Sequence, residues 1–418
     1  MKPIVVFPFA SELHGKEYYL NLFEIIKKKF TPYGIEIYSE VITNETSALE
    51  ALKTYKDFIP IAIALTGGTS RLIHTFVEHG NIERLFIFAH PEHNSLASAV
   101  SARARCERDG VLVGLYYCSS IYDSSCDYSI WRLITVARTV SNIVGSKVGV
   151  VSEEADTEIE EAAKDRLAWE IEHISFTELQ QVIDRIDDTR IQEFMEKIDS
   201  IKIEGAREPL RAIGKLYFAL KDIAKSHNLN YIAIDCFPFI LKYGYSPCIA
   251  LALLNAEGIV VACEADISAL IGMIIARSVS GMSGWISNIV NVFGNNGIFA
   301  HCTIAMDIAK ELIALNHFES GKPYGLTGKF IGNTATLISI DRDLTLMTVT
   351  RGKVKASGSL GYPACRTQAL VEFDYIAEEI PRLAPTNHHV FIMGDYIDIV
   401  KDVGYMLGLD VIDYKGLV

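Results

Sequence analysis

Long hydrophobic runs and a surplus of basic residues are both missing from this 418-residue sequence. The best apolar stretch, residues 267–276, is far shorter than the roughly 18 residues that a membrane-spanning helix needs. Lys and Arg number 39 against 52 Asp and Glu, which gives a net charge of −13. Binding to nucleic acid or to an anionic membrane depends on a basic surface, so we expect neither partner.

Paired cysteine motifs are missing as well. Eight cysteines are present, but none forms a CxxC motif and their spacing is irregular, which excludes a zinc ribbon and a secreted disulfide framework. We expect most of them to be buried thiols. The opening segment, MKPIVVFPF, has one Lys and is broken by Pro8, so it predicts a buried first strand rather than a signal peptide. The cytoplasm is the expected location.

Half of the residues are hydrophobic, which is enough for a large core in two or three domains. Over residues 4–117, short apolar runs alternate with amphipathic helical segments, the pattern of a parallel sheet covered by helices. The pattern restarts after residues 119–127, with charged helical segments predicted through 153–202. We therefore expect one α/β domain over 1–125 and a second over 126–257.

The last part of the chain, residues 258–418, has a different pattern. Apolar runs flank a hairpin signal at residues 295–297, and alternating Thr, Val, Leu and Ile with glycine turns follow from about Gly325. These features predict antiparallel sheet in a barrel or sandwich. The expected fold class is α/β, with two doubly wound parallel-sheet N-terminal domains followed by a C-terminal antiparallel β-barrel-like domain.

Acidic residues directly follow two predicted strands. In α/β sheets, ligands bind just beyond the carboxyl ends of the strands. Asp235 ends the run YIAI, and Asp266 follows IVVAC after Glu264, which is expected to alternate away from Asp266. Each aspartate has a plain structural alternative as a helix N-cap. They lie 31 residues apart, one α/β unit, so both carboxylates could surround one divalent cation.

Histidine is the usual nitrogen ligand of such a cation. His388 and His389 stand at the entry to a predicted strand, and His301 lies in an apolar run. A structural or surface role is the alternative for the pair, and a satisfied core position is the alternative for His301.

Several of these segments resemble the L-fucose isomerase and L-arabinose isomerase superfamily. The likeness is carried by CEADISAL at 263–270, IDCFPFI at 234–240, WISNIVNVFGNNGIFAHCTIA at 285–305 and NHHVFIMGDYIDIVKDVGYMLGLDVID at 387–413. It is most specific in the last third of the chain, whereas before residue 200 only the domain type agrees. The resemblance implies two α/β domains, a β-rich domain and a manganese site of two carboxylates with one or two histidines.

The resemblance also implies residue roles. Asp235 and Asp266 would be metal ligands and acid/base groups, with Asp235 standing where the isomerases have Glu. His388 would be a metal ligand, while His301 and Glu264 would contact the substrate. The implied activity is aldose–ketose isomerisation of a monosaccharide through an enediolate, with Mn²⁺ or another divalent cation. A homo-oligomer, hexamer or trimer, is expected by the same analogy.

Two other functions stay open. The first is a non-catalytic sugar-binding or regulatory protein on the same scaffold. The second is a sugar-phosphate or nucleotide enzyme that uses the turn at Gly67 and Gly68, where a strand, a tight turn and a helix start would suit an anion. That turn lacks both GxGxxG and a P-loop lysine, and a simple helix N-cap is its alternative.

Overall fold

The computed structural model describes residues 2–416, and the contacts within the chain divide it into two compact units. The first unit runs to Val144 and also includes Asp402–Gly408. The second unit contains Gly145–Lys401 and the chain from Leu409.

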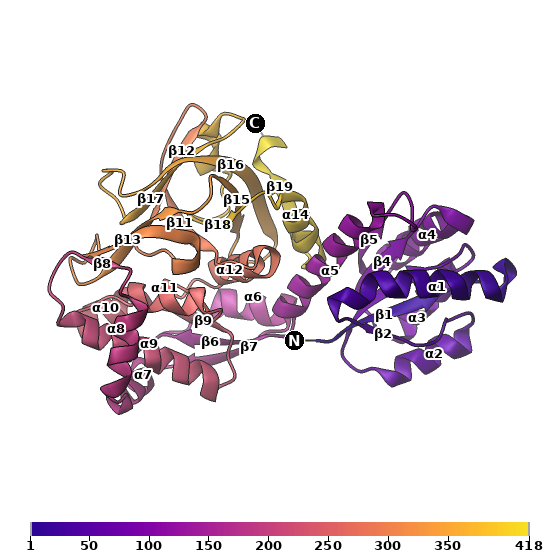
Figure 1. Ribbon diagram of the computed structural model, residues 1–418, viewed down its shortest axis with the longest axis horizontal. Helices are drawn as coiled ribbons and strands as arrows, with labels where there is room; N and C mark the ends of the chain where they lie inside the picture. The colour runs from indigo at the N-terminus through magenta and orange to yellow at the C-terminus, as the bar shows by residue number, and fades with distance from the viewer. Residues whose placement is uncertain (1, 417–418) are drawn as a thin grey trace. The chain divides into compact units, whose positions relative to one another are not determined.

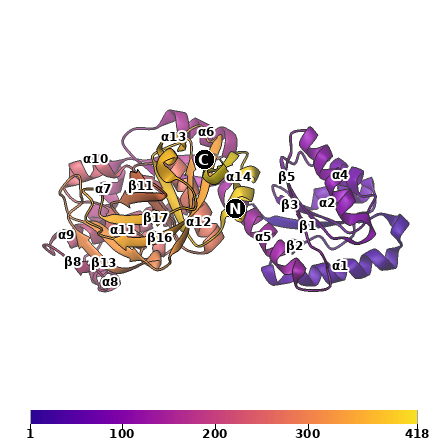
Figure 2. The same ribbon diagram turned by 90° about the horizontal axis from the view of Figure 1, so that it is seen from above.

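The first unit is a five-stranded parallel sheet with helices on both faces, as the alternating sequence pattern predicts. From edge to edge its strands are β2 (Glu36–Ile37), β1 (Ile4–Phe9), β3 (Ile59–Ala64), β4 (Arg84–Ala89) and β5 (Leu112–Tyr117). Its helices are α1 (Lys16–Phe30), α2 (Glu45–Thr54), α3 (Ser70–His79), α4 (Ser95–Arg108) and α5 (Ser125–Ile143). Helices α1 and α5 lie on one face of the sheet, and α2, α3 and α4 lie on the other (Figure 2).

The burial of apolar side chains explains why these segments form the strands and helices of the first unit. All six residues of β3 are buried, because helices cover both faces of the sheet. Helix α1 is amphipathic and turns one apolar face, which includes Leu22 and Ile26, into the core. The strand predicted over 35–41 is shorter in the structure, where only Glu36–Ile37 pairs with β1.

The second unit opens with a four-stranded parallel sheet. From edge to edge its strands are β10 (Val260–Ala262), β9 (Tyr231–Ile234), β6 (Lys147–Val151) and β7 (Glu170–Ile174). The helices around it are α6 (Thr157–Leu167), α7 (Phe176–Arg185), α8 (Thr189–Lys197), α9 (Pro209–Ser226), α10 (Cys236–Tyr243) and α11 (Cys248–Ala256). The prediction of only helical segments through 153–202 is wrong at β7. This edge strand buries just Ile174, so it has no apolar run to mark it.

A closed six-stranded antiparallel barrel follows, as the C-terminal pattern predicts. Around the barrel its strands are β15 (Thr334–Ile340), β18 (His388–Met393), β11 (Trp285–Phe293), β12 (Asn296–His301), β17 (Thr367–Glu372) and β16 (Leu346–Gly358), and β16 closes on β15. A small separate sheet contains β8 (Lys202–Ile203), β13 (Ala309–Leu315) and β14 (Gly325–Phe330), and β19 (Asp410–Asp413) pairs parallel with β16. The short helix α13 (Ile380–Leu383) also belongs to the second unit, whereas α14 (Ile397–Met406) begins in the second unit and its residues from Asp402 onward belong to the first. The hairpin expected at residues 295–297 joins β11 to β12.

Helix α12 (Ile267–Ser280) contacts both the parallel sheet and the barrel of the second unit (Figure 1). The helix approaches β18 so closely at Gly272 that a Cβ there would lie 2.8 Å from Val390. One hydrophobic core contains Ile232 of the sheet and Phe391 of the barrel. Residues on both sides of the expected 257/258 boundary therefore belong to the second unit. Helix α5, which begins at the expected 125/126 boundary, belongs to the first unit.

Across residues 2–416, no helix has the length and apolar character needed to cross a membrane. Six cysteines are free thiols, and all of them except Cys365 are buried. Cys118 and Cys126 form a disulfide in the first unit, although their spacing matches no disulfide motif.

Candidate metal centre

Two neighbouring strands of the second unit lead into carboxylates. Asp235 directly follows β9, and Glu264 comes two residues after the end of β10. The two strands pair in parallel, as expected for consecutive strands of one α/β unit. Beyond the last ladder pair, the backbone N–H of Ala265 donates to the carbonyl of Ile234 at 3.0 Å, which holds the two loops together.

A left-handed turn sets the direction of Glu264. Glu264 and Ala265 have φ values of 59° and 48°, in a region that residues other than glycine rarely occupy. Each such residue costs roughly 1–2 kcal/mol of conformational energy. The turn ends the strand, and both Glu264 and Asp266 line the same cavity, so the expectation that Glu264 alternates away from Asp266 is wrong. Strained backbone of this kind is concentrated at functional sites.

The barrel supplies two histidines to the same place. His301 is the last residue of β12, and His388 is the first residue of β18. Both strands pair with β11, where Asn288 lies opposite His388 on one side and Ala300 on the other. This arrangement brings the two imidazoles together, with their ring centroids 5.6 Å apart.

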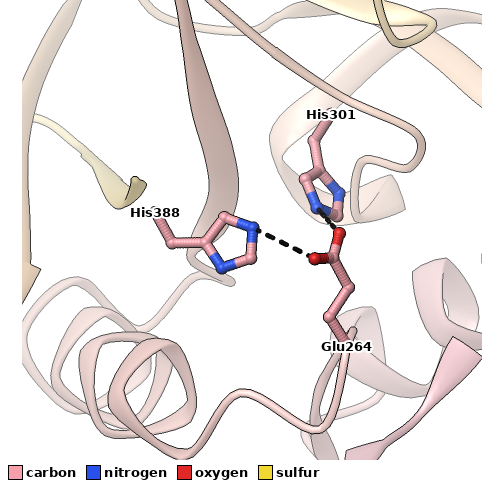
Figure 3. Close-up of side chains that lie close together, drawn as sticks. All are labelled: Glu264, His301 and His388. Carbon is pink, nitrogen blue, oxygen red and sulfur yellow. Dashed lines mark ion pairs between the residues drawn. The ribbon is translucent and has the colours of Figure 1, made fainter. Parts of the chain in front are cut away.

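Glu264 lies between these histidines (Figure 3). Its Oε1 is 3.4 Å from Nε2 of His301, and its Oε2 is 3.7 Å from Nε2 of His388. One potential ligand atom from each residue lies within 4.8 Å of the other two, and this is the one such group of three in residues 2–416. Two imidazoles and a carboxylate are a common ligand set for divalent transition metals.

The hydrogen-bond pattern fits a bound cation. Both ring nitrogens of His301 and Nε2 of His388 are buried without a hydrogen-bond partner. Buried polar atoms in native proteins almost always have a partner, and an unpartnered one points to an ion or water that completes the site. The residues present therefore fit a divalent cation, which Glu264, His301 and His388 would hold.

Asp266 has different contacts from those expected of a metal ligand. Its Oδ1 accepts the backbone N–H of Ala269 at 2.8 Å, so it caps α12 in the way the structural alternative predicts. Its Oδ2 lies 2.6 Å from Nδ1 of His388. An ionised carboxylate only accepts hydrogen bonds, so His388 carries its proton on Nδ1 and presents the lone pair of Nε2 toward Glu264. Asp266 thus orients a candidate ligand and is itself outside the converging group.

Interactions within the site shift the pKa values of Glu264 and His388. Burial alone would raise the pKa of Glu264, but the imidazoles of His301 and His388 outweigh it and hold the pKa below its usual value. Burial alone would lower the pKa of His388, but its hydrogen bond to Asp266 and the charge of Glu264 raise it. The site therefore favours an ionised Glu264.

Asp235 faces the same cavity, which has a volume of about 570 Å³ and is also lined by Glu264, Asp266 and His388. The one hydrogen bond of its carboxylate is a long contact of 3.5 Å, in which Oγ of Ser152 donates to Oδ2. Burial raises the pKa of Asp235, and the nearby charges of Glu264 and Glu154 raise it further. An acid with few partners and a raised pKa is suited to exchange protons with a ligand in the cavity.

The structure separates His388 from its neighbour His389. His389 is 1% exposed and packs against Phe299, and its Nε2 lies 3.0 Å from the hydroxyl of Tyr414. Burial lowers the pKa of His389 to about 4, so it is a neutral core residue. Of the expected site residues, His301 and Glu264 join His388 as the converging group, although the sequence predicted them as substrate contacts.

The turn at Gly67 and Gly68 lies in the first unit, at the end of β3. Its backbone N–H groups are partly used within that unit, since Gly67 donates to the carbonyl of His93 and Thr69 donates to Oγ of Ser98. Thr69 precedes α3 as its N-cap residue, but its side chain makes no capping hydrogen bond. Fewer donors therefore remain for an anion than an open turn would offer.

No protein-family model matches the chain, and no curated protein matches it. Family membership therefore supplies no function, which has to come from the chemistry of the site.

Proposed function

We propose that the second unit is a metal-dependent aldose–ketose isomerase that acts on a monosaccharide. The observation that carries the proposal is the convergence of Glu264, His301 and His388, with unpartnered imidazole nitrogens, beside Asp235, an acid that lines the same cavity as Glu264 and His388. Such an arrangement combines a cation site with a proton-transfer group, the two requirements for moving a carbonyl between adjacent carbons.

Glu264, His301 and His388 would hold the cation, and manganese is the cation that the resemblance to the sugar isomerases implies. When bound, the cation supplies Lewis-acid stabilisation of negative charge on the sugar oxygens. Asp266 fixes the proton of His388 on Nδ1 and so keeps Nε2 available as a ligand.

Asp235 is the group we assign to proton transfer. Its carboxylate would remove the proton from the carbon beside the carbonyl and return it to the neighbouring carbon. The raised pKa favours this role, because the acid that forms after the first step is more stable than an ordinary aspartic acid. Asp266 is less suited to it, since Ala269 and His388 already occupy its oxygens.

Metal content of the purified protein tests the cation site. Wild-type protein is expected to retain about one manganese ion per chain, and Glu264→Gln to retain none. Glu311→Gln, which changes an exposed carboxylate of β13 outside the site, is the matched control and should behave like wild type. Equal metal content in wild type and Glu264→Gln would overturn the site.

Deuterium incorporation tests the chemistry. Metal-loaded protein incubated in heavy water with a panel of pentoses, hexoses and deoxyhexoses should exchange the hydrogen at C2 of its aldose. Asp235→Asn should abolish exchange while retaining the metal. Tight binding of a sugar without exchange would instead favour the alternative of a non-catalytic sugar-binding protein. The expected homo-oligomer stays a prediction, and light scattering at micromolar concentration measures it.

A further inference from the structure

The parallel sheet of the first unit has a ligand-binding edge of its own. Strand β2 lies on one side of β1, and the sheet continues from β3 to β5 on the other side. Sheets with this strand order bind ligands beyond the carboxyl ends of the strands, at the reversal between β1 and β3. The three candidate ligands of the metal centre belong to the second unit, so they do not account for this edge.

Hydrogen bonds hold together the loops that follow β1, β3 and β4. The backbone N–H of Ser11, after β1, donates to Oγ1 of Thr66, after β3, at 2.8 Å. The N–H of Gly67 donates to the carbonyl of His93, after β4, at 2.6 Å. A Cβ at Gly67 would lie 2.8 Å from the Cβ of Asn94, so the loops approach closely. They form one preorganised surface at the carboxyl edge of the sheet.

Two histidines from different loops meet on this surface. His14 lies between β1 and α1, and His93 lies between β4 and α4. Their Nδ1 atoms are 3.2 Å apart, and their ring planes are inclined by 67°. Imidazole nitrogen binds zinc at about 2.0–2.1 Å, so two such nitrogens around one tetrahedral ion lie about 3.3 Å apart. The observed spacing therefore fits two ligands of a single ion.

The position of the His93 side chain is set by its surroundings. His93 and Asn94 have φ values of 47° and 59°, a strained conformation of the kind that is concentrated at functional sites. The ring of Tyr18 stacks on the imidazole of His93 with the centroids 3.7 Å apart. The hydroxyls of Tyr18 and Tyr122 both donate to Oε2 of Glu92, at 3.3 and 3.1 Å. In metal sites, support of this kind orients a ligand.

The donor atoms select the kind of ion. Two imidazoles without a carboxylate suit Zn²⁺, whereas Mn²⁺ prefers oxygen ligands and binds such a pair far more weakly. Among residues 2–416, no third His, Cys, Asp or Glu side chain converges on His14 and His93. His93 is exposed, so solvent reaches the remaining coordination positions.

We infer that His14 and His93 bind one Zn²⁺ ion in the first unit, with the other coordination positions open to water or to an exchangeable ligand. The inference goes beyond the proposed isomerase, because both ligands belong to a different unit from the metal centre. A hydrogen bond between the two imidazoles, with no ion, is the alternative explanation of their contact.

Isothermal titration of the metal-free full chain with Zn²⁺ tests the inference. His93→Asn and His14→Gln should each bind one ion fewer per chain than wild type. Asn suits the left-handed backbone at position 93, which keeps the loop folded. His79→Gln is the matched control and should bind as many ions as wild type. His79 is an exposed histidine of α3 whose Nδ1 lies 2.9 Å from the carbonyl of Thr75.

The same comparison on the Glu264→Gln background separates this site from the metal centre of the second unit. His93→Asn should again remove one ion, whether or not the metal centre also takes up zinc. Equal numbers of bound ions in wild type, His14→Gln and His93→Asn would overturn the inference and leave the hydrogen bond as the explanation. Loss of an ion in His79→Gln as well would also overturn it, because the effect would not be specific to the pair.

Discussion

Two carboxylates separated by one residue have different tasks in this site. Strand geometry does not continue through these residues, because the backbone at Glu264 and Ala265 is left-handed. Glu264 then faces the imidazoles, and Asp266 lies at the start of α12, where it binds both the helix and His388.

These tasks predict different outcomes for two similar substitutions. Asp266→Asn should weaken manganese binding by about 10- to 100-fold, the range measured for residues that orient a ligand. An Asn amide can donate to Nδ1 of His388, which would move the proton to Nε2 and remove the lone pair that the metal needs. Glu264→Gln should weaken binding further, because it removes a ligand.

Calorimetric titration with Mn²⁺ measures both affinities. Asn is also a good N-cap, so Asp266→Asn should keep the stability of α12, which separates a metal effect from unfolding. Wild-type affinity in Asp266→Asn, or a larger loss in Asp266→Asn than in Glu264→Gln, would contradict the assignment.

The same turn predicts a stabilising substitution. Ala265→Gly should raise the free energy of unfolding by about 0.5–1 kcal/mol, because glycine adopts φ near 48° without strain and this gain exceeds its larger unfolded-state entropy. Ala262→Gly, in the buried strand β10, is the control and should destabilise. Urea denaturation measures both changes, and destabilisation by Ala265→Gly would show that the turn is not strained.

At the scale of elements, periodicity predicted most strands and helices because the buried segments have clear patterns. The fully apolar β3 and the hairpin between β11 and β12 illustrate this. The edge strand β7 was missed because it buries a single residue, and an edge strand needs no apolar run. The rule that α/β sheets bind ligands at the carboxyl ends of their strands also led to Asp235 and to residues 263–266 as candidates for the site. The choice of Glu264 over Asp266 depends on backbone conformation that periodicity does not report.

A charged cluster connects three helices of the second unit. Glu257, just after α11, accepts from the hydroxyl of Tyr217 on α9 at 2.7 Å and pairs with Lys221 on α9 and Lys197 on α8. Burial alone would raise the pKa of Glu257, but these hydrogen bonds outweigh it and lower the pKa to about 2.

A lowered carboxyl pKa stabilises the fold at neutral pH. The stabilisation is present above the ordinary pKa of 4.5 and is lost as the pH falls toward about 2, because the unfolded chain takes up the proton first. Glu257→Gln should therefore lower the free energy of unfolding by about 1–2 kcal/mol at pH 7, allowing for screening at the partly exposed lysines. The difference from wild type should shrink below pH 4.

Urea denaturation at pH 7 and pH 3 measures this change, with Glu161→Gln on the exposed side of α6 as the control. A Glu257→Gln difference that is equally large at both pH values would show that packing, and not the charge, causes the effect.

At the scale of the whole molecule, the candidate ligands come from distant parts of the chain. Glu264 follows the parallel sheet, whereas His301 and His388 belong to different strands of the barrel. No local pattern marks residues that meet only after the barrel closes. From the residues alone, a structural role was therefore the favoured interpretation of each histidine. The resemblance to sugar isomerases selected His388 but gave His301 a different task.

This distribution predicts where a bound metal stabilises the protein. All three ligands lie in the second unit, so Mn²⁺ at about 100 times its dissociation constant should stabilise that unit by about 2.7 kcal/mol and leave the first unit unchanged. Hydrogen exchange measured by mass spectrometry should slow in peptides that cover β10, β12 and β18 and stay constant in peptides from β1 and β3. Glu264→Gln should abolish the protection. Equal protection of both units would show that the metal acts elsewhere, whereas protection confined to the second unit would confirm that sheet and barrel share one ion.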